Sequence, residues 1–245
     1  MFSHSNTAWF FSVLMATLIF SLSLMGVAPA QINTSLGTGA FQSNTTGSLN
    51  TAIGFVALGS NTTGSVNTAT GVDSLFSNTT GNVNTANGVD ALFSNTEGSS
   101  NTACGADALL HNTTGRANTG IGAGALFSNT EGFQNTAIGA NGLISNSTGS
   151  SNVAIGIDAL LMNTTGRANT AIGGGAGVSA GNLVNATAIG NSAIVDASNK
   201  VRIGNTAVTV IQGQVPFTAS SDKTKKENFE LWMEKKCWER YAAWS

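Results

Sequence analysis

The chain carries little charge and few of the residues that perform chemistry. Of its 245 residues 9% are charged, and ten Lys and Arg against twelve Asp and Glu give a net charge of -2. Binding of nucleic acid therefore has no electrostatic basis. The two cysteines, Cys104 and Cys237, are far apart, which does not support a disulfide framework. His4 and His111 are the only histidines, and this excludes a catalytic triad and a His-based metal site. We expect no enzymatic activity and no cofactor.

The first thirty residues differ from the rest. An apolar run extends from Trp9 to Met25 and ends at the small residues Ala28-Pro29-Ala30. This pattern predicts a signal peptide over residues 1–30, cut before Gln31. No Lys or Arg precedes Arg116, however, so an uncleaved membrane anchor is the alternative. In either case we expect a secreted or cell-surface protein.

A repeat of seventeen residues, such as TAIGFVALGSNTTGSVN, then begins at Thr34 and continues without an insertion. Counted from its first residue, position 4 is always Gly, while positions 11 and 17 are Asn and position 14 is Gly in the first eight units. A fixed period indicates one structural unit per repeat, stabilised by stacking on its neighbours. The asparagines at position 11 are Asn44, Asn61, Asn78, Asn95, Asn112, Asn129, Asn146 and Asn163. We expect them to form a hydrogen-bonded amide ladder.

The glycines at positions 4 and 14 would weaken a helix, and no unit has an unbroken helical stripe. We therefore predict an all-β protein, a parallel β-solenoid of 17-residue coils. Two short strands per coil are expected, around T-A-I-G and A-L-F-S, with a turn at Asn-Thr-Thr-Gly. Position 2 is small and should pack tightly, and position 8 is Leu or Phe in these units and should fill the interior.

Position 9 is expected to point outward, because neighbouring residues of a strand face opposite sides. Six consecutive coils have a large apolar residue there. These are Phe76, Phe93, Leu110, Phe127, Ile144 and Leu161. A continuous exposed apolar stripe indicates an interface between chains. A bulge that turns position 9 inward is the alternative.

Other recurring positions suggest weaker hypotheses. Asp73, Asp90 and Asp107 share position 6 in successive coils, where bound Ca2+ would relieve their repulsion. Solvation on an outer turn explains them as well, and we expect no metal. Cys104 at position 3 is expected to be a small core residue. The Thr residues at position 1 are expected in a narrow turn, which disfavours ice binding by a Thr rank.

The A-I-G and V-A-I-G cores, as at Thr51–Gly54 and Val153–Gly156, resemble the YadA-like head of trimeric autotransporter adhesins. The resemblance covers residues 31–204 and implies a left-handed β-roll that associates as a homotrimer. The usual coil of that family has fourteen residues, whereas this chain has seventeen until its last step. No membrane barrel follows the repeats, so we expect the chain not to anchor itself as an autotransporter does.

Residues 205–229 resemble a neck and the start of the intramolecular chaperone domain of phage tailspikes, of the self-cleaving endosialidase type. In that family a Ser before Asp and a Lys five residues later perform autocleavage, and Ser221 and Lys226 occupy those places. Only the first dozen or so residues match, so a polar linker is the alternative.

Residues 230–245, ELWMEKKCWERYAAWS, differ in composition from the rest. The chaperone family continues with a segment resembling V-D-G-E-E-V-L. Back-translating Glu230–Trp238 and shifting the reading frame recovers a compatible segment. We infer a frameshift near Phe229 that left Ser221 and Lys226 without their domain. An amphipathic helix is the alternative, although its aromatic residues do not keep to one face.

Two functions follow from these patterns. The first is a non-enzymatic exported surface or fibre protein, an adhesin-like trimeric stalk and head with an extracellular glycan or matrix ligand. The second is a fragment of a phage-type tail fibre or tailspike, which binds a receptor and has lost its self-cleaving chaperone.

Overall fold

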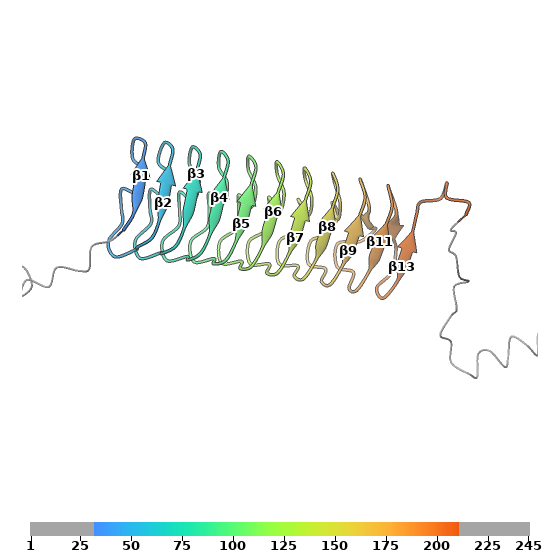
Figure 1. Ribbon diagram of the computed structural model, residues 1–245. Helices are drawn as coiled ribbons and strands as arrows, with labels where there is room; N and C mark the ends of the chain where they lie inside the picture. Colours follow the sequence, from blue (N-terminus) through green and yellow to red (C-terminus); the bar gives the residue numbers. More distant parts are fainter. Residues whose placement is uncertain (1–31, 211–245) are drawn as a thin grey trace, which may run out of the picture. The chain divides into compact units, whose positions relative to one another are not determined.

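The computed structural model describes residues 32–210, and they form a parallel β-solenoid (Figure 1). One strand from each coil joins a single eleven-stranded parallel sheet, whose order follows the chain from β1 to β13. The strands of this sheet are β1 (Thr34–Leu36), β2 (Thr51–Ile53), β3 (Thr68–Thr70), β4 (Thr85–Asn87), β5 (Thr102–Cys104), β6 (Thr119–Ile121), β7 (Thr136–Ile138), β8 (Val153–Ile155), β9 (Thr170–Ile172), β11 (Thr187–Ile189) and β13 (Val201–Ile203). The predicted all-β solenoid is confirmed.

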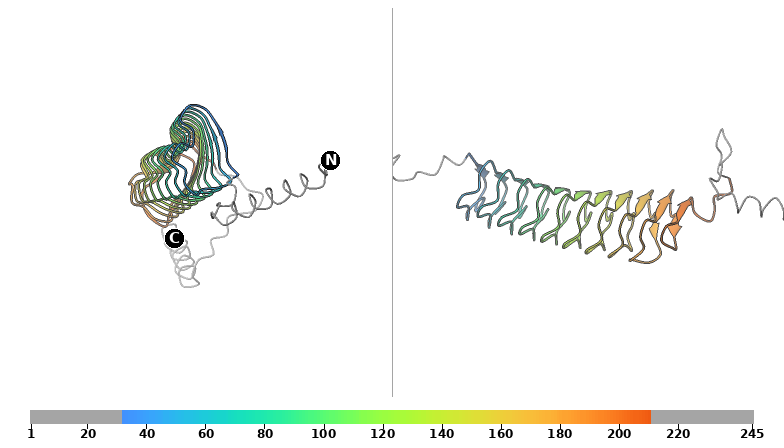
Figure 2. Two further views of the ribbon diagram at one scale, coloured as in Figure 1. Left: turned by 90° about the vertical axis from the view of Figure 1, so that its left-hand side faces the viewer. Right: turned by 90° about the horizontal axis from the view of Figure 1, so that it is seen from below.

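The register of the sheet reproduces the period of the sequence. Thr51 pairs with Thr68, and each later strand pairs with the next at the same seventeen-residue step as far as Thr187. Thr187 then pairs with Val201, a step of fourteen. Seen along its axis, the solenoid presents nested coil outlines (Figure 2). Each residue therefore lies beside its own equivalent in the next coil.

The interior is narrow and is filled by small residues and one Leu per coil. From the second coil onward, the alanines at positions 2 and 7 are buried, as are the Leu residues at position 8. These leucines are Leu58, Leu75, Leu92, Leu109, Leu126, Leu143 and Leu160. Positions 2 and 8 thus have the packing roles that the sequence predicts.

The predicted second strand around A-L-F-S is wrong for most coils. The Leu at position 8 has a φ between 51 and 56° in the seven coils from Leu58 to Leu160, so the chain turns there instead of extending. Hydrogen bonds between coils persist, for example from the N–H of Leu75 to the carbonyl of Ala91 at 3.0 Å. Among residues 32–210, a second strand forms only in the coils that begin at Thr170 and Thr187, where β10 (Gly177–Val178) pairs with β12 (Ile194–Val195).

These last coils show how the turn at position 8 determines which side chain enters the core. Where the chain is extended, position 9 points inward, and Val178 and Val195 are buried. Where position 8 is left-handed, the Leu points inward and position 9 lies at the surface. The side chain that enters the core is therefore selected by one backbone angle.

The predicted amide ladder at position 11 is confirmed. The Nδ2 group of Asn78 donates to Oδ1 of Asn61 at 2.7 Å and to the carbonyl of Gly81 at 3.0 Å. The same pair of bonds recurs from Asn61 through Asn163, and donation runs toward the preceding coil. Among residues 32–210, no buried side-chain nitrogen or oxygen lacks a hydrogen-bond partner.

Position 17 forms a second Asn ladder, which was not predicted from the sequence although this position is Asn in each of the first eight units. The backbone N–H of Asn84 donates to Oδ1 of Asn67 at 2.9 Å, and Nδ2 of Asn84 donates to the carbonyl of Gly98 at 2.8 Å. These side chains are fully buried from Asn67 through Asn169. The two ladders together replace much of the apolar core that so thin a coil cannot hold.

The two glycine ranks permit the close approach of successive coils. At position 4 the φ angles lie between 112 and 142°, a region that L side chains rarely adopt. A Cβ on Gly88 would also overlap the backbone of Gly105 in the next coil. At position 14, a Cβ on Gly81 would overlap the carbonyl oxygen of Gly98.

Candidate functional site

The outer face of the eleven-stranded sheet is an uncharged surface that runs along the solenoid. Position 2 points inward, so positions 1 and 3 point outward and position 5 continues the exposed surface. No charged residue occupies positions 1, 3 or 5 in any of the ten coils from Thr34 onward. Eleven large apolar residues at positions 3 and 5 are between 37 and 68% exposed. These are Leu36, Ile53, Phe55, Val72, Val89, Ile121, Ile138, Ile155, Ile157, Ile172 and Ile189.

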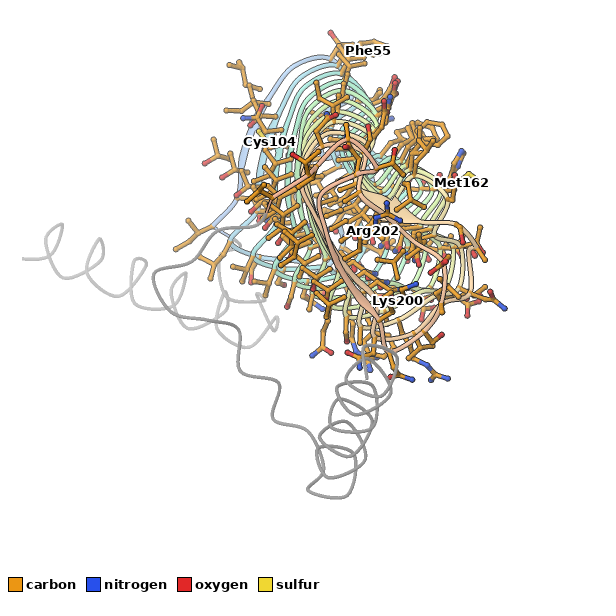
Figure 3. The ribbon with its side chains drawn as sticks, turned by 90° about the vertical axis from the view of Figure 1, so that its right-hand side faces the viewer. Phe55, Cys104, Met162, Lys200 and Arg202 are labelled. Carbon is orange, nitrogen blue, oxygen red and sulfur yellow. The ribbon has the colours of Figure 1, made fainter. Side chains whose placement is uncertain are left out.

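Two expectations about this face are wrong. Cys104 is exposed and not a core residue, because position 3 shares the outward face with position 1 (Figure 3). The Thr residues at position 1 lie in strands of a regular sheet and not in a narrow turn. The exposed Ile residues at position 3 were also not predicted from the sequence, although the absence of charged residues from positions 1, 3 and 5 indicates a distinct surface.

The side chains at position 9 form a narrower apolar stripe on another part of the surface. The rings of Phe76 and Phe93 stack with their centroids 5.4 Å apart, and His111 meets Phe127 edge-on at 4.8 Å. The members of the stripe from Phe76 through Ile144 are partly buried, and Leu161 is 40% exposed. The outward direction of position 9 was predicted on the assumption that positions 8 and 9 alternate in a strand. Position 9 instead points outward because the residue at position 8 is left-handed.

Figure 3 places these surfaces relative to one another. Cys104, at position 3, and Met162, at position 10, project from opposite sides of the coil stack (Figure 3). Phe55, at position 5, lies at one edge between them, and Lys200 lies toward the other edge. The sheet face and the side that carries positions 9 and 10 are thus separate surfaces.

The acidic rank at position 6 has a backbone explanation. Asp73, Asp90 and Asp107 have φ angles of 55 to 58°, and Asn141 and Asp158 at the same position have 56°. Asp and Asn tolerate this left-handed conformation better than most residues do. Burial, and then the neighbouring carboxylates of Asp73 and Asp107, raise the pKa of Asp90 above its usual 3.8. Farther along the chain, position 6 is Asn141 and then Asp158, and the amide of Asn141 donates to Asp158 at 3.1 Å, so no pair of neighbouring carboxylates forms there.

No group of three or more potential metal ligands occurs among residues 32–210. Within this same range, no helix is long and apolar enough to span a membrane. Several expectations concern residues that the structure does not describe. They are the signal peptide 1–30, the autocleavage candidates Ser221 and Lys226, and the frameshifted tail 230–245.

Comparison with models of known families gives no match, and no curated protein matches the chain. The resemblance to YadA-like heads and to tailspike chaperone domains therefore rests on the motifs quoted above.

Proposed function

We propose that this chain is a non-enzymatic, exported surface or fibre protein, adhesin-like, whose solenoids associate as a homotrimer. The observation that supports this most strongly is the uncharged outer face of the sheet. Its large apolar residues extend along the solenoid from Leu36 to Ile189, with a break in the coil of β5, where positions 3 and 5 are Cys104 and Ala106. An exposed apolar surface of this extent is rare on a monomer and is typical of an interface.

The area of this face is sufficient for association. The eleven apolar residues expose on the order of 800 Å2 together, which is close to the share of one partner in a standard protein interface. Three identical flat faces can surround one axis and so remove all three from water, and the resemblance to trimeric adhesin heads favours that number. The recurring Asn and Gly residues of the repeat stabilise the stacking of coils. This is typical of an elongated scaffold and not of a catalytic pocket.

Two apolar surfaces compete for the role of interface. The sequence pattern predicted the interface at the position-9 stripe, Phe76 through Leu161. The sheet face supports a broader contact, because positions 1, 3 and 5 all contribute to it, whereas the stripe has one residue per coil and its phenyl rings already contact one another. We therefore place the main interface on the sheet face.

Sedimentation of the full chain tests this proposal. We expect the wild type at three times the protomer mass of 24.8 kDa, less any segment removed on export. The double variant Ile138→Asp, Ile155→Asp should sediment as a monomer. Phe93→Asp, Phe127→Asp is the matched variant and should retain the oligomer. Circular dichroism must show that both variants keep the solenoid.

Cys104 offers an independent readout, since it lies on the proposed interface. With Cys237 changed to Ser, a short thiol-reactive cross-linker should join protomers through Cys104. A wild-type chain that sediments as a monomer, without cross-links, would overturn the proposal. In a monomer the Thr residues at position 1 would be exposed to solvent. An ice-recrystallisation assay would then test whether the sheet face binds ice.

A further inference from the structure

A hollow of about 550 Å3 is lined by residues of the four coils that contain β6 to β9, away from positions 1, 3 and 5 of the sheet face. It is formed at positions 13, 15 and 16, in the segment between the two Asn ladders. Its lining includes Phe133, Thr148, Ser150, Thr165, Arg167 and Asn182. Among these six residues there is an aromatic ring, a guanidinium, hydroxyls and an amide, but no carboxylate.

The hollow results from a change in side-chain size along one rank. Position 15 is Ser or Asn in the first four coils, and then reads Arg116, Phe133, Ser150, Arg167 and Val184. Ser150 is 8% exposed and accepts a hydrogen bond from the backbone N–H of Phe133 at 3.2 Å. Phe133 and Arg167 are two coil steps apart, or about 10 Å at the spacing of stacked strands. One large side chain therefore borders the small residue on each side.

The bordering side chains have different surroundings. The guanidinium of Arg116 lies 5.4 Å from the centroid of the Phe133 ring. Arg116 belongs to the coil before Phe133 and is not among the residues that line the hollow. Arg167 forms no ion pair within residues 32–210, where Lys200 and Asp196 form one instead. Arg167 and Phe133 thus both line the hollow, and Arg167 is exposed and free of an ion pair with any described residue.

We propose that this hollow binds a carboxylated saccharide, a uronic-acid residue of an extracellular glycan. The Arg167 guanidinium would hold the sugar carboxylate through a two-pronged hydrogen bond, which its planar fork favours. The less polar face of the sugar ring would lie against Phe133. Thr148, Thr165 and Asn182 would exchange hydrogen bonds with the sugar hydroxyls.

Selectivity follows from the same arrangement. A neutral sugar would leave Arg167 without a partner. General attraction of polyanions does not explain binding, because the net charge of the chain is -2. The inference rests on the proposed function in that an exported fibre would meet such glycans, but the site itself is contained within one protomer.

Titration calorimetry of the full chain with tri-galacturonic acid tests the inference, with cellotriose as the neutral sugar and a sulfated trisaccharide as the second anion. We expect binding of tri-galacturonic acid and none of cellotriose. Arg167→Gln should weaken binding at least tenfold. Ser150→Phe should abolish it by filling the hollow, and the fold should tolerate this change because Phe133 occupies the same position one coil earlier. Lys200→Gln removes the same charge elsewhere and should have no effect.

Three results would overturn the inference: no binding of tri-galacturonic acid, unchanged binding by Arg167→Gln, or equal binding of the sulfated sugar. Circular dichroism of each variant excludes loss of the fold as the cause. Sedimentation of the same samples separates the two proposals. A trimer that does not bind the sugar removes only the saccharide site, and a monomer that binds it removes only the proposed association.

Discussion

Asn95 donates from Nδ2 to Oδ1 of Asn78 at 2.7 Å, and both side chains are fully buried. Asn95 also donates to the carbonyl of Gly98 at 2.9 Å and accepts from Asn112 at 2.7 Å. Each amide thus joins the coil before it to the coil after it. A buried ladder of this kind is stabilising only while every member has its partners.

Replacing Asn95 by Ala should therefore destabilise the solenoid. The change leaves Oδ1 of Asn78 and one N–H of Asn112 without their partners, at a cost of about 2–3 kcal/mol in the free energy of unfolding. Denaturant unfolding followed by circular dichroism measures this cost. Asn82→Ala is the control, because Asn82 is exposed and water can replace its bonds; its effect should stay below about 1 kcal/mol.

Gly88→Ala should prevent stable stacking at that coil. The φ of Gly88 is 142°, and a Cβ would lie 2.6 Å from the carbonyl carbon of Gly105. Strain and overlap together should cost more than about 3 kcal/mol. Gly174→Ala is the matched control, since its nearest neighbour is a movable Asn191 side chain at 3.3 Å. Equal melting temperatures for the two variants would contradict the proposed role of position 4.

Asp90→Asn should stabilise the protein at neutral pH. The raised pKa of Asp90 means that the folded state binds its proton more tightly than the unfolded state does. The wild type therefore loses stability as pH rises from about 3.8 through the raised pKa. The variant lacks this loss, so it should be more stable by a few tenths of a kcal/mol above that window.

Toward pH 3, where Asp90 is mostly protonated in both states, the advantage of the variant should become small. Salt should also reduce it at neutral pH, because part of it is repulsion by Asp73 and Asp107. Melting temperatures of both proteins between pH 3 and 7, at low and high salt, give the comparison. A difference that is independent of pH would show that the carboxylate charge is not responsible.

The stacked rings of Phe76 and Phe93 predict a moderate role for the position-9 stripe within one protomer. Phe93→Ala should lower stability by about 1–2 kcal/mol through lost ring contact and partial burial. Phe133→Ala is a useful comparison, because that ring is 39% exposed and lies near the guanidinium of Arg116 instead of stacking on another ring. If Phe93→Ala instead dissociates the oligomer at unchanged protomer stability, the stripe and not the sheet face forms the interface.

The sequence by itself determined the parallel stacking, the period and the Asn ladder at position 11. In-register coils place each residue beside its own copy, so a residue type that bonds or packs well with itself recurs at a fixed step. The invariance of Asn61 and Asn78, or of Gly88 and Gly105, is therefore readable as self-contact without knowledge of the coil's path. The second ladder at position 17 was equally visible, and was missed only because no role was assigned to it.

The tertiary structure alone decided the left-handed conformation at position 8 and the exposure of position 3. A left-handed Leu costs about 1–2 kcal/mol by local preference, so neighbouring residues do not predict it. Burial of that Leu contributes about 2–3 kcal/mol, and only the closed coil provides the interior in which it is buried. At Leu92 the coil therefore turns, and Phe93 lies at the surface. At Ile194, where the coil is shorter and extended, Val195 takes the inner place.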